Sequence, residues 1–452
     1  MDLALVDIDP EALKVAEGLA AKMIAARKAK IKLSASTRRR DVLREATAVI
    51  CTIGVGGRRA WEQDVFVPRK YGIYQPVGDT VGPGGTSRAM RMIPSMVAVA
   101  KDVMNLCPRA LFFNYGNPMS ATCRAIRKAT AAPVVGLCHG IPDTARLLAG
   151  KLGAMEADGT TPRFKYSAVG INHCSWFTDV RVDDKPALDR LLEMGREALR
   201  NSGEYDTGGP KAGQKDPEER RRFSWQLTLF FGLFPGVGDR HMTEFFPALT
   251  LGLKGYFGKT LGIDAYSFEG TIESGDRKFD EMKAHALSDK PLPADYFAEM
   301  EGEHEQVVEI IDAIRGNSGA VYPANVPNHG QVPGLLDDAV IECPVRATSE
   351  GLKPVQQGRL PSGVENTLNA RFAAVETTVE AALEGNGRKF AQALLLDGAV
   401  YSLETATKLA AELMEAQSAF LSGAEKSHSR SGISMGERVD DGTAAGPDEG
   451  VY

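Results

Sequence analysis

A cysteine and a histidine each stand at the end of a segment that has the apolar character of a buried strand. Cys138 ends the stretch 133–138, and His173 follows the stretch 168–172. A thiolate and an imidazole that meet in one crevice can bind a divalent transition metal and leave coordination positions open for a substrate. A lone cysteine or histidine is more often structural, since a free thiol usually fills apolar space. The residues by themselves therefore leave both a metal site and a structural role open.

The segment 236–247, GVGDRHMTEFFP, places a carboxylate, a guanidinium and an imidazole side by side after an apolar stretch. Asp239, Arg240 and His241 together are typical of an active-site loop, in which an acid or base transfers a proton. The alternative is that Asp239 caps a helix and its neighbours are solvated.

Two further segments follow apolar strands and carry polar groups. The segment 78–85, GDTVGPGG, surrounds Asp79 with glycine, and Arg88 opens the next helix. Such a segment serves either as a substrate-binding loop or as a rigid connector. In the segment 114–118, NYGNP, the amide of Asn117 can hold a nicotinamide or sugar hydroxyls, or it can form an Asx turn.

The N-terminal segment indicates a nucleotide site. Asp7 ends a strand where a dinucleotide-binding unit places the acid that contacts the adenosine ribose, although a strand-end Asp is also a common helix cap. Thr52, Gly54, Gly56 and Gly57 form a glycine-rich turn after another strand, which lets the backbone pass close to a ligand.

The elements that must position these residues alternate between strands and helices. Apolar runs at 3–7, 48–57, 110–118 and 133–140 are separated by segments whose apolar residues recur every three or four positions. This alternation predicts an α/β fold with a Rossmann-like doubly wound parallel sheet, in which ligands gather at the carboxyl ends of the strands.

The pattern changes near residue 165. We expect an NAD-binding domain at 1–165 and a mixed α+β, mainly helical domain at 166–421 that binds substrate and metal and forms the oligomer. The polar stretch 201–222 is expected to be an exposed loop, and 400–421 a terminal helix. The segment 422–452 is polar and rich in Gly, Ser and Asp, which predicts a disordered tail.

Composition is that of a globular enzyme. Of 452 residues 43% are hydrophobic, and 53 Lys and Arg against 59 Asp and Glu give a net charge of −6, which favours a small-molecule substrate over nucleic acid. We expect no membrane partner and a cytoplasmic location with reduced thiols. The cysteines expected to be structural are Cys51, Cys107, Cys123, Cys174 and Cys343, and the histidines expected to be solvated are His285, His304 and His428.

The chain resembles glycoside hydrolase family 4, the NAD- and divalent-metal-dependent glycosidases. The resemblance covers about residues 1–421 and rests on these motifs: LALVDIDP, TIGVGG, NYGNPMS, GLCHG, GINH, GDRHMTEFFP and NVPNHGQVPG. It implies that Cys138 and His173 are ligands of a cation, most often Mn²⁺, and that the protein is a homodimer or homotetramer.

The resemblance also implies roles for other residues. Asn117 would contact both substrate and nicotinamide, and Asp7 would hold the adenosine ribose, with Thr52 and Gly54 beside the cofactor. Asp239 would be the base at C2 of the sugar, and His139 would act near the leaving group. Asp79, Arg88 and Arg240 would contact the substrate.

The implied reaction is hydrolysis of an O-glycosidic bond. NAD⁺ takes hydride from C3, a base removes the acidified C2 proton, the glycosidic oxygen leaves by elimination, and water adds before the hydride returns. The motifs are most similar to the α-galacturonidase branch, whereas Gly140 and Ile141 after the Cys-His pair resemble the α-glucosidase group, so the sugar stays open.

Two alternatives to a glycosidase remain at this stage. One is an NAD-dependent 2-hydroxy-acid dehydrogenase, which shares the doubly wound sheet. The other is a catalytically inactive relative, because the resemblance includes a first strand and a phosphate-binding glycine loop that do not precede LALVD in this sequence. We expect a start codon assigned too late rather than an inactive protein.

Overall fold

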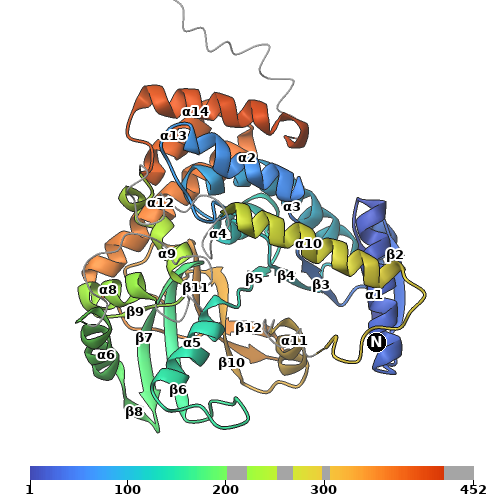
Figure 1. The fold of residues 1–452 in the computed structure, drawn as a ribbon, viewed down its shortest axis with the longest axis horizontal. Coiled ribbons are helices and arrows are strands. Elements are labelled where there is room, and N and C mark those ends of the chain that lie inside the picture. The colour runs from blue at the N-terminus through green and yellow to red at the C-terminus, as the bar shows by residue number, and fades with distance from the viewer. Residues whose placement is uncertain (201–220, 252–267, 298–305, 422–452) are drawn as a thin grey trace, which may run out of the picture.

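The computed structural model describes residues 1–200, 221–251, 268–297 and 306–421 (Figure 1). The predicted tail at 422–452, nearly all of the polar stretch at 201–222, His304 and His428 lie outside the described residues. No helix of the described part is long and apolar enough to cross a membrane.

The N-terminal third alternates strands and helices as predicted. Its elements in chain order are β1 Asp2–Val6, α1 Pro10–Ala26, β2 Lys32–Ser36, the 3-10 helices Arg39–Asp41 and Leu43–Glu45, β3 Ala48–Cys51, α2 Gly57–Arg69, α3 Gly82–Leu106, β4 Leu111–Asn114, α4 Met119–Thr130, β5 Val134–Gly136 and α5 Gly140–Lys151. Helix α1 begins where the sequence indicates, because the Asp9 carboxylate accepts hydrogen bonds from the first backbone N–H groups and Pro10 occupies the first helical position.

The remainder is a mixture of antiparallel strands and helices. Its elements are β6 Phe164–Ile171, β7 Cys174–Val182, β8 Lys185–Pro186, α6 Leu188–Arg200, α8 Arg222–Phe231, β9 Phe234–Pro235, α9 Asp239–Glu244, the 3-10 helix Pro247–Thr250, α10 Phe268–Leu287, α11 Val307–Arg315, β10 Val321–Pro327, β11 Val340–Thr348, β12 Gly351–Pro354, α12 Ser362–Glu384, α13 Gly387–Asp397, α14 Leu403–Ala416 and the 3-10 helix Ser418–Phe420. The predicted terminal helix is therefore confirmed as α14.

The main sheet contains strands from both predicted domains. Its order is β3-β4-β5-β10-β11-β6-β7-β8, with β9 paired to β7 and β12 paired to β11. Strands β3, β4 and β5 are parallel, and the others are antiparallel to their neighbours. The predicted domain boundary at 165/166 falls near the start of β6, so it divides the chain but not the sheet.

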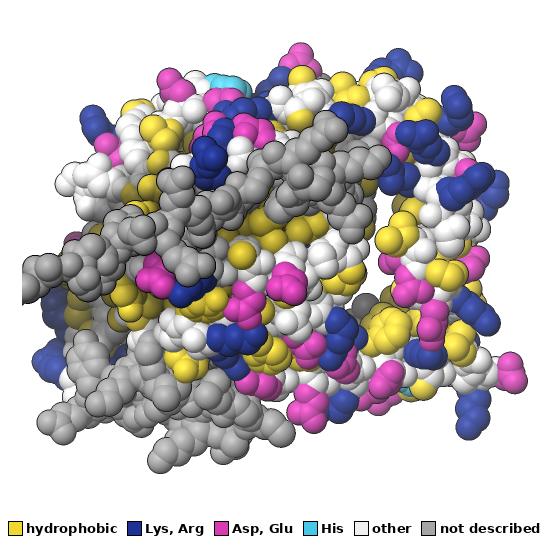
Figure 2. All heavy atoms as spheres, turned by 90° about the horizontal axis from the view of Figure 1, so that it is seen from above, with side chains coloured by type: hydrophobic (Ala, Val, Ile, Leu, Met, Phe, Trp, Pro, Cys, Tyr) yellow, Lys and Arg dark blue, Asp and Glu magenta, His cyan; other side chains and the backbone are white. Residues whose placement is uncertain are grey.

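Strands β1 and β2 form a separate parallel pair at the N-terminal side of the molecule. Within the described residues, β1 pairs only with β2 and β3 only with β4, and Val6 and Ile50 are 38% and 45% exposed. Seen from above, an opening separates the part of the molecule where Figure 1 places α1 and β2 from the body (Figure 2). Helix α10 connects the two parts by packing on α1 through Val15, Leu19 and Ala286.

The long helix α3 packs against α2, α4, α12 and α13, which gather on one side of the sheet (Figure 1). The predicted structural cysteines are all buried and unpaired, namely Cys51, Cys107, Cys123, Cys174 and Cys343. Burial raises the pKa of Cys123, Cys174 and Cys343 to about 12, so these thiols stay protonated at neutral pH.

Candidate metal centre and active site

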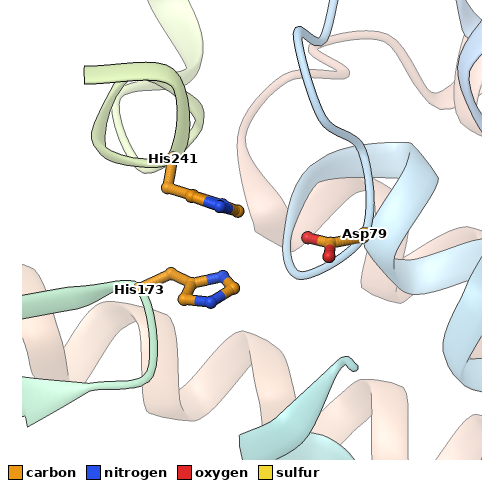
Figure 3. A group of neighbouring side chains, drawn as sticks. All are labelled: Asp79, His173 and His241. Carbon is orange, nitrogen blue, oxygen red and sulfur yellow. The ribbon is translucent and has the colours of Figure 1, made fainter. Parts of the chain in front are cut away.

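Three side chains from distant parts of the sequence converge at the carboxyl ends of the central strands. Asp79 lies on the loop between α2 and α3, His173 on the two-residue turn between β6 and β7, and His241 in the first turn of α9 (Figure 3). One nitrogen or oxygen atom from each lies within 4.8 Å of the other two. Among the described residues, this is the one group of three or more His, Cys, Asp and Glu side chains spaced to hold a metal ion.

Thr80 fixes the orientation of two members of this group. Its Oγ1 lies 2.7 Å from Asp79 Oδ1 and 2.8 Å from His173 Nδ1. A hydroxyl has one proton, so when Thr80 donates to the Asp79 carboxylate it accepts from the Nδ1–H of His173. This tautomer leaves the lone pair of His173 on Nε2, the usual arrangement of a metal-binding histidine held by a neighbour.

The electrostatics of the cluster favour metal binding. Burial lowers the pKa of His173, and burial together with the neighbouring His173 lowers the pKa of His241 well below its ordinary value. Burial would raise the pKa of Asp79, but His241 and His173 in their protonated forms, the charge of Arg88 and the hydrogen bond from Thr80 together lower it below its ordinary value. At neutral pH both imidazoles are therefore neutral and the carboxylate is ionised, which are the forms that coordinate a cation.

The donor set fits a divalent transition metal. Two imidazole nitrogens and one carboxylate oxygen suit ions such as Mn²⁺ and leave positions for a substrate. The rings of His173 and His241 lie 3.9 Å apart at 40°, and Nδ1 of His241 is buried without a hydrogen-bond partner. Ligand bonds of about 2.0–2.2 Å require only small adjustments of these side chains.

Asn117 and Arg88 extend the site toward the glycine-rich turn. Asn117 Nδ2 donates to Asp79 Oδ2 at 2.8 Å, and Arg88 Nε donates to the carbonyl oxygen of Asn117 at 3.0 Å. The Oδ1 atom of Asn117 is buried and has no partner, so it can accept a hydrogen bond from a ligand. A Cβ on Gly54 would lie 3.4 Å from Arg88 Nη2, which places the turn after β3 beside the same arginine.

Glu244 holds the loop that carries Asp79. Its Oε1 accepts hydrogen bonds from the backbone N–H groups of Val77 and Gly78, both at 2.8 Å. Burial raises the pKa of Glu244 to about 8, against the lowering effect of these two hydrogen bonds. The carboxyl is therefore largely protonated at neutral pH.

We expect Glu244→Gln to gain stability relative to the wild type as pH rises. The folded state keeps the Glu244 proton to a higher pH than the unfolded state, whose pKa is near 4.5. The stability that this carboxyl contributes is complete below about pH 4.5 and is lost as pH rises through about 8, whereas glutamine does not ionise. Urea unfolding at pH 5 and pH 8 should show the difference growing by about 1–3 kcal/mol in favour of the variant.

The matched control is Glu412→Gln, because hydrogen bonding to Lys70 lowers the pKa of Glu412 instead of raising it. That variant should not gain over the wild type as pH rises. A Glu244→Gln variant that behaves like this control would show that Glu244 is ionised in the folded protein.

Cys138 and His139 lie at the start of α5, as the alternation of strands predicts. Gly140 N donates to Cys138 Sγ at 3.4 Å, and a Cβ on Gly140 would lie 2.7 Å from Val237 on the loop that leads to His241. His139 Nδ1 is 2.6 Å from Asp143 Oδ2. Cys138 is not part of the three-residue group, so the predicted pairing of Cys138 with His173 on one cation stays a prediction.

Asp239 and Arg240 lie beside His241 but make other contacts. The carboxylate of Asp239 is buried and accepts from Phe223 N at 2.8 Å, Ser224 N at 2.9 Å and Ser224 Oγ at 2.6 Å, at the start of α8. The capping role considered for Asp239 is thus observed, while its role as the base stays a prediction. Arg240 Nη2 donates to the carbonyl oxygen of Pro76 and to Thr271 Oγ1.

The predicted ribose contact, Asp7, is not one of the three residues of this cluster. Asp7 is exposed at the end of β1, and its Oδ1 accepts from Asp9 N at 2.9 Å. Thr52 is exposed after β3.

His285, expected to be solvated, is half-buried, with its ring 5.4 Å from that of Tyr296.

The sequence alone did not indicate that His241 and Asp79 belong to one group that could hold a metal ion. Both residues stood out in glycine-rich segments, but the segments are 162 positions apart, and only the fold brings them together. His241 could have been recognised from its residue type, because imidazole is the commonest side-chain ligand of transition metals. It directly follows two polar residues, Asp239 and Arg240, which make other contacts.

Comparison with known proteins points to one enzyme family. The profile of family 4 glycosyl hydrolases matches residues 1–154, and that of the family 4 glycosyl hydrolase C-terminal domain matches residues 168–400. The chain is 32% identical over 394 residues to the alpha-galacturonidase of Thermoanaerobacterium saccharolyticum, covering 85% of this chain and 82% of that protein.

Solved structures share the fold. A Bacillus subtilis protein described as the glucosidase lplD superposes with a TM-score of 0.76 at 26% identity, over 91% of this chain and 92% of that one. A 6-phospho-alpha-glucosidase from gut microorganisms, determined with NAD and Mn²⁺, gives a TM-score of 0.74 at 18% identity, over 93% of this chain and 92% of that one.

The fold and the site define an α/β enzyme that gathers metal-binding and polar side chains at the carboxyl ends of its sheet strands. The two matching profiles and the alpha-galacturonidase relative then place it: the chain belongs to glycosyl hydrolase family 4. The predicted family and fold class are confirmed, and the assignment favours a glycosidase over a 2-hydroxy-acid dehydrogenase.

Proposed function

We propose that the protein hydrolyses α-glycosidic bonds with NAD⁺ and a divalent cation, Mn²⁺ above all, at the site formed by Asp79, His173 and His241. The observation that carries the proposal is the convergence of two neutral imidazoles and one ionised carboxylate on a point next to Asn117. The NAD and Mn²⁺ bound by the 6-phospho-alpha-glucosidase of the same fold support the choice of cofactors.

When bound, NAD⁺ supplies a reversible hydride acceptor for C3 of the sugar and the cation a Lewis acid for the resulting carbonyl, which together acidify the C2 proton. A base on the protein removes that proton, the glycosidic oxygen leaves by elimination, water adds, and the return of the hydride to C3 restores the sugar, so there is no net redox change. We assign the base to Asp239 and a role near the leaving group to His139. Both assignments rest on the family resemblance.

The residues around the cluster orient what binds there. His173, held through Nδ1 by Thr80, presents Nε2, and Asp79 is fixed by Thr80 and Asn117. The free Oδ1 of Asn117 can accept from a sugar hydroxyl or from the carboxamide of nicotinamide. Asp7, Thr52 and Gly54 are the remaining candidates for cofactor contacts.

The sugar is proposed to be an α-galacturonide, with an α-glucoside as the alternative. The alpha-galacturonidase relative supports the first. A galacturonide brings a carboxylate that needs a cation, and Arg88 and Arg240 are the two candidates next to the cluster. Arg240 is the better candidate for binding the carboxylate, because its Nε is buried without a partner whereas Arg88 Nε donates to Asn117.

The test is an assay with p-nitrophenyl α-galacturonide and p-nitrophenyl α-glucoside in D₂O. We expect cleavage only with both NAD⁺ and Mn²⁺, loss of activity on chelation, one deuterium at C2 of the product and no net NADH. Cleavage that needs neither cofactor, or a product without deuterium, would contradict the proposal. Net NADH without cleavage would instead indicate a dehydrogenase.

We also propose that Cys138 contributes a thiolate to the same cation. Cys138→Ser should lower Mn²⁺ affinity and turnover by at least about tenfold while the melting temperature of the metal-free protein stays within a few degrees. Cys107→Ser, at a buried thiol outside the site, is the control. Wild-type Mn²⁺ affinity in Cys138→Ser would remove Cys138 from the ligand set.

We propose a homodimer or homotetramer, to be measured by light scattering after gel filtration.

A thiolate ligand is sensitive to oxidation, which supports a reducing compartment such as the cytoplasm. Peroxide treatment of the metal-free protein should abolish activity, and dithiothreitol should restore it.

A further inference from the structure

A row of side chains crosses the main sheet just before the turn that carries His173. Neighbouring strands pair in register along this row, whose members are Gly136 on β5, Asn325 on β10, Glu342 on β11, Gly170 on β6 and Ser175 on β7. Asn325, Glu342 and Ser175 are at most 1% exposed. A buried carboxyl thus lies in the centre of the sheet, outside the three-residue cluster.

Gly170 makes a contact possible between strands that are not neighbours. A Cβ at this position would lie 2.2 Å from the carbonyl oxygen of Cys174 and 2.4 Å from Cα of Ser175, so a side chain does not fit. Across this gap the Glu342 carboxyl on β11 reaches past β6 to β7, and its Oε2 lies 2.6 Å from Ser175 Oγ. Ser175 is two residues beyond His173.

The contacts of Ser175 are complete when Glu342 is a neutral acid. Ser175 Oγ also lies 3.2 Å from the carbonyl oxygen of Ile171, the last residue before the turn. Ser175 has one proton, so it can donate to Ile171 only if Glu342 donates to it. Asn325 Nδ2 lies 3.3 Å from the other oxygen, Oε1, and no charged partner of Glu342 is found among the described residues.

The environment of Glu342 agrees with this hydrogen-bond pattern. Burial raises the pKa of Glu342 to about 7, against the lowering effect of its interactions with Ser175, Asn325 and Asn172. The carboxyl is therefore easily protonated near neutral pH.

The turn itself needs support from its surroundings. His173 has φ of 65°, in the left-handed region that residues other than glycine seldom adopt. Such a conformation persists when neighbouring contacts hold it in place. Ser175 contacts Ile171 across the turn and Glu342 beyond it, which ties both ends of the turn to the middle of the sheet.

We propose that Glu342, as a neutral carboxylic acid acting through Ser175, is a positioning residue that holds the β6–β7 turn in the conformation presenting His173 to the cation. The inference rests on the proposed function, since it assumes that His173 binds the metal. Residues behind metal ligands commonly contribute tenfold to a hundredfold to metal affinity.

The test compares two substitutions by calorimetric titration of the NAD-free protein with Mn²⁺. Glutamine keeps an N–H for Ser175 and an oxygen for Asn325, so Glu342→Gln should bind Mn²⁺ within about threefold of the wild type. Glu342→Ala should weaken binding by about tenfold or more, and saturating Mn²⁺ should restore most of kcat. The control is Cys343→Ala, on the same strand but facing the opposite side of the sheet, which should leave Mn²⁺ affinity unchanged.

The outcomes separate the inference from the function on which it rests. Wild-type affinity in Glu342→Ala, or a Glu342→Gln variant as weak as the alanine variant, would overturn the positioning role while the metal centre stands. Absence of Mn²⁺ binding by the wild type would overturn both. Should Glu342→Ala not fold, Ser175→Ala removes the same contact with a smaller change in volume and must weaken Mn²⁺ binding likewise.

Discussion

His241→Ala should lower turnover by about a thousandfold or more at limiting Mn²⁺, an effect of several kcal/mol on the transition state. The substitution removes one of the three side chains that converge at the cluster and leaves His173 and Asp79, with the proposed thiolate of Cys138, to hold the cation. Excess Mn²⁺ should recover only part of the activity, because the Lewis acid also loses its orientation. Steady-state kinetics over a range of Mn²⁺ concentrations measure both effects.

The control is His329→Ala, which removes an exposed imidazole that is not part of the cluster. It should leave the Mn²⁺ requirement and kcat unchanged. Equal activity in His241→Ala and His329→Ala would show that His241 is not a ligand, and the metal would have to bind His173 with other partners.

Asp64→Ala should lower the free energy of unfolding by about 3–5 kcal/mol. Asp64 and Arg91 are 0% and 1% exposed and form a two-pronged ion pair, with Nη1–Oδ1 and Nη2–Oδ2 distances of 2.8 and 2.5 Å. Ser87 Oγ and Gln417 Nε2 also donate to the Asp64 carboxylate. Removing the carboxylate leaves a buried guanidinium unpaired and several donors unsatisfied.

The double variant Asp64→Leu/Arg91→Met separates the energetic effect of an unpaired charge from the effect of packing around these two positions. Replacing both charges with apolar side chains should recover most of the loss, because no unpaired charge remains. Urea unfolding of the single and double variants gives the comparison. A loss below about 1 kcal/mol for Asp64→Ala would mean that water or another group compensates Arg91.

Much of the fold could be predicted because local patterns determine it. The apolar runs that end at Val6, Cys51, Asn114 and Gly136 each form a strand, and the helical spacing between them forms the covering helices. The placement of β10 and β11 between β5 and β6 could not be predicted. These strands begin 150 or more positions after the end of β6, and no local signal records which strand edge they pair with.

The candidate site, like the fold, could be predicted from the sequence only in part. Asp79, Asn117 and Arg88 stood out because strand ends and glycine-rich segments point to ligands, and the structure brings all three together. The segment around Asp239 also stood out, yet in the structure its neighbour His241 joins the cluster while Asp239 binds the start of α8. Adjacent polar residues on a helix point in different directions, so spacing alone does not tell which of them joins the group that could hold a metal ion.

Glu342 gave no signal in the sequence. It lies in a strand of apolar residues, and its contact with Ser175 depends on a glycine in the strand between them. Such a contact depends on the pairing of β11 with β6, two strands far apart in the sequence, and no local pattern records that pairing.

The central claim, that one divalent cation binds His173 and His241 beside Asn117, is tested most directly by anomalous diffraction from crystals grown with Mn²⁺ and NAD⁺. The account predicts a single strong manganese peak within bonding distance of both imidazoles, with Asp79 or Cys138 completing the protein ligands. A peak at some other place, or no peak at saturating Mn²⁺, would contradict it.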